Sequence, residues 1–302
     1  MNFYPITRAV DNGPVLSGWY TQQNHSSVLF FAHGNGFSTR VYEPLLVLLA
    51  QKYDLLMFDL PGHGQSPSHE FVGWNQTAEH LHSALQMCED VTAGRQIDCV
   101  AHSLGGMLTI LAASVHPATF RSMVLLDPIM FPQPLLLILH VLNRLRLTPL
   151  FHPFVKPTLK RRSHWPDKEQ ALQYFHGRKI FKGWQDEALQ SYVDYALIED
   201  ANGVRLCCEP VLEATWFSTL PALLWPSVSA LRCPVKLFMG ADTYPFSLRA
   251  GRYAQKRNRQ VKFSVVTGGH CFMQEDPQRA SSYVLDALEE KNLINEIDGS
   301  DL

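Results

Sequence analysis

The sequence predicts an α/β fold, in which a parallel sheet has helices on both faces and carries one helical insertion. Three observations support this prediction. Short apolar runs alternate with longer helical patterns, a serine with small neighbours directly follows one of these runs, and the alternation stops between Asp127 and Cys233. A chain of 302 residues can bury one large core and still carry such an insertion.

The apolar runs have the length and composition of buried strands, and the segments between them have the spacing of helices. We expect strands at Val28 to Ala32, Leu55 to Phe58, Ile97 to Ala101, Met123 to Leu126, Val235 to Met239 and Lys262 to Val266. We expect helices at Tyr42 to Gln51, Thr77 to Val91, Leu104 to Val115 and Pro277 to Glu290.

The break in the alternation sets the expected domain boundaries. Residues 1–127 and 233–302 are predicted to form the α/β core, and residues 128–232 an inserted helical cap. Between Lys156 and Lys182 this cap has eight Lys and Arg residues and only two acidic residues. A solvated helical surface is the simplest explanation of the excess, and a lid that attracts anions is the alternative.

The charge and composition of the chain argue against several classes of binding partner: nucleic acid, a membrane and a metal ion are not expected. The formal net charge of −2 gives no electrostatic reason to expect nucleic acid. The N-terminal residues lack a basic stretch followed by an apolar core, and no apolar run is long enough to cross a bilayer. We therefore expect a cytoplasmic protein without stable membrane insertion, and the oligomeric state stays open. The six cysteines show no metal-ligand spacing, so no metal is expected.

The turn at Ser103 has the strongest chemical signal. From Cys99 to Gly106 the sequence CVAHSLGG passes from an apolar strand through Ser103 into an apolar helix that begins at Leu104. Small neighbours let the chain turn sharply and expose the hydroxyl, and the helix N-terminus directs free amides toward it. This pattern is typical of a nucleophile, although an ordinary turn in which serine caps the helix has the same short pattern.

A serine nucleophile needs a base that accepts its proton and an acid that orients the base. His270 follows the last predicted strand through two glycines, at the carboxyl end where open α/β sheets hold their active sites. We predict His270 as the general base. Asp242 also follows a strand and is the preferred acid, and Asp127, at the end of the strand before the insertion, is the alternative.

Other segments complete the predicted site. A glycine-bearing turn follows the strand at Val28 to Ala32, and we expect the backbone amides of Asn35 and Leu104 to form an oxyanion hole. The Gly-rich segment after Asp59 lacks the lysine and the spacing of a phosphate-binding loop. The residues expected to line the substrate pocket are Phe37, Phe131, Trp184, Trp216, Tyr244 and Cys271.

Taken together, these segments resemble the α/β-hydrolase superfamily, because HGNGF, DLPGHGQS, AHSLGG, MGAD and GGHCFMQEDP occur in the family's order along nearly the whole chain. The resemblance implies an eight-stranded, mostly parallel sheet, a cap inserted after the sixth strand, and Ser103, His270 and Asp242 as the catalytic residues. The chain departs from the family at two positions. Ala101 replaces the first glycine of G-x-S-x-G, and the segment that ends in Asp242 is one residue shorter than the usual G-x-x-D.

The expected function is that of an esterase- or lipase-like serine hydrolase, which needs no cofactor and cleaves small-molecule carboxylic esters or thioesters through an acyl-enzyme on Ser103. Family members that open epoxides or remove halides have an aspartate at the position of this serine, so those reactions are not expected. Two alternatives stay open. One is a carbon–carbon bond hydrolase or lyase acting on a dicarbonyl or enolic acid, and the other is a ligand sensor with a vestigial triad.

Overall fold

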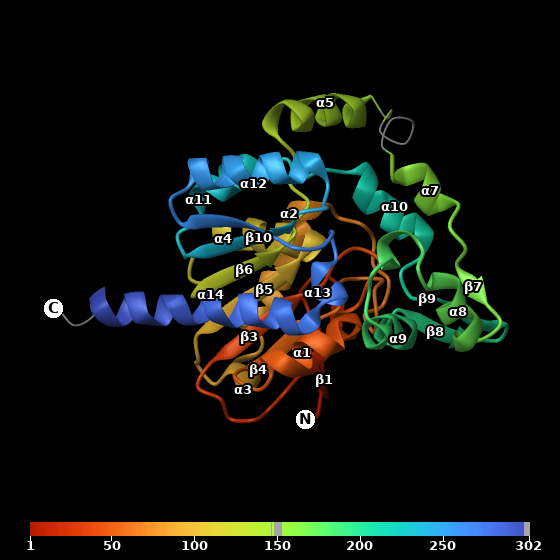
Figure 1. The fold of residues 1–302 in the computed structure, drawn as a ribbon, viewed down its shortest axis with the longest axis horizontal. Helices are drawn as coiled ribbons and strands as arrows, with labels where there is room; N and C mark the ends of the chain where they lie inside the picture. The colour runs from red at the N-terminus through yellow and green to blue at the C-terminus, as the bar shows by residue number, and fades with distance from the viewer. Residues whose placement is uncertain (146, 148–152, 299–302) are drawn as a thin grey trace.

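An eight-stranded sheet forms the centre of the computed structural model, which describes residues 1–145, 147 and 153–298 (Figure 1). The strand order is β1-β2-β4-β3-β5-β6-β10-β11. The pairs β1/β2 and β2/β4 are antiparallel, and every later pair is parallel. The strands are β1 (Tyr4–Ala9), β2 (Val15–Tyr20), β3 (Val28–Ala32), β4 (Asp54–Phe58), β5 (Ile97–His102), β6 (Ser122–Leu126), β10 (Val235–Gly240) and β11 (Val261–Val266).

The predicted mostly parallel, eight-stranded sheet is confirmed, and each of the six apolar runs forms one of its strands. The runs are apolar throughout because helices cover both faces of the sheet. In β3, for example, Phe30 packs into the core on one face, whereas Leu29 and Phe31 pack into the core on the other. Strands β1 and β2 were not among the predicted runs. β1 is the edge strand and has four exposed positions of six, and β2 beside it has two buried positions of six, so neither has a continuous buried apolar stretch.

Two layers of helices enclose the sheet (Figure 1). One layer consists of α2 (Trp74–Gln86), α4 (Ser103–Val115), α11 (Leu224–Ala230) and α12 (Pro245–Arg257). The other consists of α1 (Glu43–Leu49), α9 (Asp186–Tyr195), α13 (Phe272–Glu275) and α14 (Pro277–Asp298). A 3-10 turn η1 (Thr39–Tyr42) precedes α1, and the short helix α3 (Glu89–Thr92) follows α2.

The chain between β6 and β10 leaves the central sheet; its helices α9 and α11 join the two layers that cover the sheet, and its other elements lie beside and above them (Figure 1). It contains α5 (Gln133–Arg144), α7 (Val155–Leu159), α8 (Lys168–Phe175), η2 (Lys179–Phe181), α9, α10 (Pro210–Ser218) and α11. We call residues 128–232 the insertion. Of the predicted domains, residues 146 and 148–152 of the insertion and 299–302 of the core lie outside the described residues.

The sequence predicted a helical insertion, but the insertion is not purely helical. It also holds a three-stranded antiparallel sheet in the order β7-β9-β8, formed by β7 (His164–Trp165), β9 (Gly203–Leu206) and β8 (Leu197–Asp200). Strands of two to four residues are too short to show an alternating pattern, which explains why they were not predicted. Within the described ranges, no helix combines the length and apolar character that a membrane span requires.

Candidate active site

Ser103 lies at a strained turn between β5 and α4. Its φ angle is 52°, a left-handed conformation that residues other than glycine rarely adopt. Gly105 in the first turn of α4 lies against β3 so closely that an added Cβ would be 2.6 Å from the carbonyl oxygen of Ala32. The absence of a side chain at this position lets the helix N-terminus approach the end of the sheet, which presents the Ser103 hydroxyl at its carboxyl edge.

His270 connects the serine to a carboxylate. Its Nε2 lies 3.1 Å from Oγ of Ser103, and its Nδ1 lies 2.9 Å from Oδ1 of Asp127. Because Nδ1–H donates to the carboxylate, Nε2 is left to accept the proton of the hydroxyl. The loop that carries His270 is anchored as well, since the backbone N–H of Gly269 donates to Glu275 Oε1 at 3.0 Å.

Asp127 is held by more than His270. Its side chain is fully buried, and its Oδ1 also accepts a hydrogen bond of 2.8 Å from the hydroxyl of Thr243. Its Oδ2 accepts one of 2.8 Å from the backbone N–H of Gly240. Three donors therefore satisfy the carboxylate and fix its orientation toward the imidazole.

The sequence favoured Asp242 as the acid, and this preference is wrong. In the structure His270 is paired with the alternative, Asp127. The two aspartates follow β6 and β10, which are parallel neighbours, so both lie at the same end of the sheet. Asp242 is exposed, and its backbone N–H donates to the carbonyl oxygen of Gly268. It contributes to the wall of the pocket described below, away from the imidazole.

The two predicted oxyanion donors lie in the wall of the same pocket as Ser103. Leu104 is the second residue of α4, so its N–H belongs to the first helical turn, which has no acceptor within the helix. Asn35 is held from the insertion, because its side-chain amide donates to the carbonyl oxygen of Glu213 at 3.0 Å.

A chain of hydrogen bonds links the turns behind these residues. The hydroxyl of Tyr42 accepts from the backbone N–H of Gly34 at 3.1 Å and lies 2.6 Å from Nδ1 of His102. Nε2 of His102 donates to the backbone oxygen of His270 at 3.0 Å. Burial and the neighbouring imidazole of His270 lower the pKa of His102 well below its usual value. His102 is therefore neutral, with Nδ1 free to accept from Tyr42.

Cys271 follows His270 in the chain and lines the pocket. Its side chain is buried, and burial together with the charge of Asp127 raises the pKa of the thiol well above its usual value. Because the thiolate is the reactive form of cysteine, this thiol is a poor nucleophile near neutral pH.

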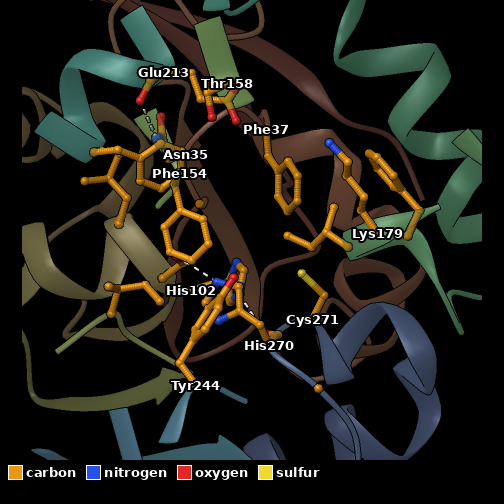
Figure 2. Close-up of a pocket in the computed structure, with 18 of the residues that line it drawn as sticks. Asn35, Phe37, His102, Phe154, Thr158, Lys179, Glu213, Tyr244, His270 and Cys271 are labelled. Carbon is orange, nitrogen blue, oxygen red and sulfur yellow. Dashed lines mark hydrogen bonds between the residues drawn. The ribbon is translucent and has the colours of Figure 1, made fainter. Parts of the chain in front are cut away.

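A cavity of about 880 Å³ opens between the sheet and the insertion (Figure 2). Most of its wall is aromatic or aliphatic. Five of the six predicted lining residues do line it: Phe37, Phe131, Trp216, Tyr244 and Cys271. Trp184 lies one layer behind, where its ring packs edge-on against Phe37 with 5.7 Å between centroids.

A buried ion pair forms one polar part of this wall. Arg161 pairs with Glu213 of α10, and Arg161 Nη2 also donates to the hydroxyl of Tyr192 at 3.1 Å. Burial raises the pKa of Glu213, although the guanidinium of Arg161 opposes the rise. Figure 2 shows Glu213 close to Asn35, so the pair supports the loop that carries one predicted oxyanion donor.

Sequence reasoning missed several of these residues: Tyr42, Arg161, Glu213 and Thr243. The one available signal was a single charged residue in the otherwise apolar or small sequence of α10, PVLEATWFS. A lone glutamate on such a helix needs a partner when it is buried. Nothing in the local sequence identified Arg161 as that partner, because 52 residues separate the two.

The chemistry available at the floor of the pocket is nucleophilic. A serine hydroxyl and an imidazole placed to accept its proton line the pocket there, and the buried carboxylate of Asp127 behind them orients the imidazole. Among the described side chains, no three His, Cys, Asp or Glu residues gather in a way that could hold a metal ion.

A comparison with protein families agrees with this geometry. The model described as "Alpha/beta hydrolase family" matches residues 29–281, from β3 into α14. The chain belongs to the alpha/beta hydrolase family. The match includes Ser103, Asp127 and His270, and the fold expected from the sequence is thereby confirmed.

The curated relatives of this alpha/beta hydrolase have names that indicate different substrates. A 2-(acetamidomethylene)succinate hydrolase of Mesorhizobium japonicum is 30% identical over 122 residues, 40% of this chain and 42% of that protein. A monoglyceride lipase of Homo sapiens is 32% identical over 126 residues, 38% of this chain and 39% of that protein. The match thus spans about two fifths of the length of these curated relatives.

A solved structure extends the similarity to nearly the whole fold. The crystal structure of an E-2-(acetamidomethylene)succinate hydrolase superposes with a TM-score of 0.72 and 21% identity, covering 95% of this chain and 100% of that chain. At this identity the likeness shows the fold and not the reaction.

Proposed function

We propose that this alpha/beta hydrolase is a serine hydrolase that cleaves carboxylic esters or thioesters, with Ser103 as nucleophile, His270 as base and Asp127 as acid. The continuous chain of hydrogen bonds from Ser103 through His270 to Asp127 is the observation that carries the proposal. The three residues come from the ends of three different strands, β5, β11 and β6. A purely structural role for them does not account for this convergence at one cavity.

In the proposed reaction, Nε2 of His270 accepts the hydroxyl proton while Oγ of Ser103 attacks the substrate carbonyl. The carbonyl oxygen becomes negative and is stabilised by the amides of Asn35 and Leu104. His270 then donates its proton to the leaving alcohol or thiol, which leaves an ester between the acyl group and Ser103. A water molecule deprotonated by His270 hydrolyses this ester and restores the serine.

The insertion acts as a cap in this proposal. Residues of the sheet domain form the floor of the pocket, and Phe154, Phe175 and Trp216 of the insertion line it from the opposite side. Aromatic walls favour a substrate whose acyl or alcohol part is apolar. The monoglyceride lipase among the relatives is consistent with such a substrate.

A second reaction class is favoured by the charge of the cap. A carbon–carbon bond hydrolase or a lyase acting on a dicarbonyl or enolic acid would use the same serine and histidine on an anionic substrate. Five Lys and Arg residues line the pocket: Arg161, Arg162, Arg178, Lys179 and Lys182. One relative is named as a hydrolase of a succinate derivative, which is also an anion.

The test is hydrolysis of a chromogenic ester series with acyl chains from short to long. We expect turnover with an optimum at one chain length, and Ser103→Ala should lower it by about 10⁴-fold or more. Ser114→Ala, at a partly exposed serine of α4 outside the pocket, is the control and should retain activity. Normal turnover by Ser103→Ala would refute the mechanism. Absence of ester turnover in a protein whose Ser103 is still labelled by an activated phosphonate would favour the second reaction class.

A further inference from the structure

Four exposed cations lie on the rim of the pocket. Arg162, Arg178, Lys179 and Lys182 are exposed and also line the cavity, so they stand where it opens to solvent. We call these four residues the rim cations. The three acidic residues in the pocket wall are Glu213, Asp242 and Glu275.

The acidic residues of the wall do not neutralise the rim. Glu213 is paired with Arg161 inside the pocket, and Glu275 accepts the backbone N–H of Gly269. Asp242 is the remaining exposed carboxylate. In the part of the chain that the structure describes, no carboxylate lies within ion-pair distance of a rim cation.

Three other cations of the insertion form ion pairs, Arg161, Lys168 and Arg205, whereas none of the four rim cations does so among the described residues. Lys168 lies 3.0 Å from Asp194, and Arg205 lies 3.7 Å from Asp200. The protein as a whole has a formal net charge of −2. A local excess of positive charge at a cavity mouth with aromatic, low-dielectric walls concentrates the field that an entering anion experiences.

Aromatic and backbone contacts hold two of the rim cations in place. The guanidinium of Arg178 lies 4.4 Å from the ring centroid of Tyr174, and that of Arg162 lies 5.5 Å from the same ring. Tyr174 also lines the pocket. Nε of Arg162 donates to the backbone oxygen of His164, which leaves its two terminal nitrogens to bind another acceptor.

Lys179 is positioned by an unusual backbone. Its φ angle is 45°, in the left-handed region, where strain often accompanies function. Its ammonium group is directed into the cavity beside Phe37 (Figure 2). Burial raises the pKa of Glu213, and the charge of Lys179 opposes this rise, less strongly than that of Arg161.

We infer that the rim cations form a recognition site for an anionic group, a carboxylate or a phosphate, on the part of the substrate that reaches the pocket mouth. The substrate is then an amphiphile, with an apolar part against the aromatic wall and a negative end at Lys179 and the two arginines. This inference rests on the proposed ester or thioester hydrolysis and names the substrate class for it.

Two matched pairs of substrates test the inference and distinguish the two ends of the substrate. Para-nitrophenyl hexanoate and the para-nitrophenyl half-ester of adipic acid differ by a carboxylate at the end of the acyl chain. Hexanoyl-pantetheine and hexanoyl-4′-phosphopantetheine differ by one phosphate on the leaving group. We expect the anionic member of one pair to have the higher kcat/KM, by about tenfold at low salt and less at high salt.

Substitutions of the rim cations test whether these residues cause the preference for the anionic substrate. Lys179→Gln and the double variant Arg162→Gln/Arg178→Gln should each lower the ratio of anionic to neutral kcat/KM severalfold. Lys256→Gln, an exposed lysine of α12 outside the pocket, should leave the ratio unchanged. Equal kcat/KM for both members of both pairs, or a preference that survives the rim variants, would overturn the inference.

A measurement without turnover separates this inference from the proposed reaction. The ketones 6-oxoheptanoate and 2-heptanone have no ester bond to cleave and differ only by the terminal carboxylate, so they can be compared as ligands that protect Ser103 from labelling by an uncharged phosphonate. Stronger protection by the anion, lost in Lys179→Gln, would support the recognition site even if no ester were hydrolysed. Equal protection would count against it.

Discussion

The hydroxyl of Tyr42 lies 2.6 Å from Nδ1 of His102, and this contact links three active-site segments. Tyr42 also accepts the N–H of Gly34 in the loop of the predicted oxyanion donor Asn35. His102 precedes Ser103 and donates to the backbone of His270. One buried tyrosine therefore fixes the positions of the oxyanion loop, the serine turn and the histidine loop relative to one another.

Tyr42→Phe should lower kcat by about tenfold or more with a smaller change in KM, because a misplaced site loses transition-state stabilisation more than ground-state binding. It should also lower the free energy of unfolding by about 1–3 kcal/mol, since the N–H of Gly34 loses its acceptor. Ester kinetics and urea unfolding measure both. Tyr53→Phe, at another buried tyrosine outside the site, is the control; equal losses of kcat in both variants would contradict the role of Tyr42.

Substitution of the two candidate acids, Asp127 and Asp242, should change kcat to different extents. Asp127→Asn should lower kcat by up to about 10⁴-fold, because the amide no longer holds the histidine in the tautomer that accepts the serine proton. Asp242→Asn should stay within a few-fold of the wild type, since Asp242 is exposed and does not contact His270. Purified variants with unchanged circular dichroism should be compared on one ester. A larger loss in the Asp242 variant would reverse the pairing proposed here.

Two buried histidines should make stability depend on pH. Nε2 of His33 accepts the N–H of Leu60 at 2.9 Å, and Nε2 of His63 accepts the N–H of Gly36 at 3.2 Å. Burial lowers the pKa of His33 to about 4, and burial and the charge of His33 lower the pKa of His63 to about 3. In the unfolded chain both imidazoles have a pKa of about 6.5, so below that pH the unfolded state binds more protons than the folded state.

The free energy of unfolding should therefore be highest above about pH 6.5, where both histidines are neutral in both states. It should decrease by a few kcal/mol in total as the pH falls toward about 4. Urea unfolding between neutral pH and pH 4 measures the slope. His63→Gln, whose amide oxygen can accept from Gly36 without titrating, should flatten the slope, whereas His176→Gln at an exposed site should not. An unchanged slope in His63→Gln would show that this imidazole does not titrate as described.

The ion pair between Arg161 and Glu213 should be costly to break on one side only. Arg161→Met leaves a buried carboxylate without its cation and should lower the free energy of unfolding by about 2–4 kcal/mol. The double variant Arg161→Met/Glu213→Leu should recover most of that loss. Arg205→Met removes a more exposed pair and should cost at most about 0.5 kcal/mol. If the single and double variants were equally unstable, packing rather than the unpaired charge would be responsible.

The predictable part of this protein lies in its buried strands. The apolar runs that became β3, β4, β5, β6, β10 and β11 are visible in the sequence because both faces of the sheet are covered. Ser103 directly follows β5 and His270 follows β11 after a three-residue turn, so their meeting at the carboxyl edge could be expected. The edge strands β1 and β2 and the short strands of the insertion lacked this signal.

The sequence by itself determined six of the eight strands of the sheet, four of the helices that cover it, and the positions of Ser103 and His270, because each depends on a local pattern in or next to a strand. Only the tertiary structure decided between Asp127 and Asp242. Parallel pairing of β6 and β10 brings both to one edge, and the donors that hold the chosen carboxylate, Thr243 and Gly240, come from the other strand's turn. The same holds for Tyr42 with His102 and for Arg161 with Glu213, which are far apart in the chain and meet only when the sheet and the insertion pack together.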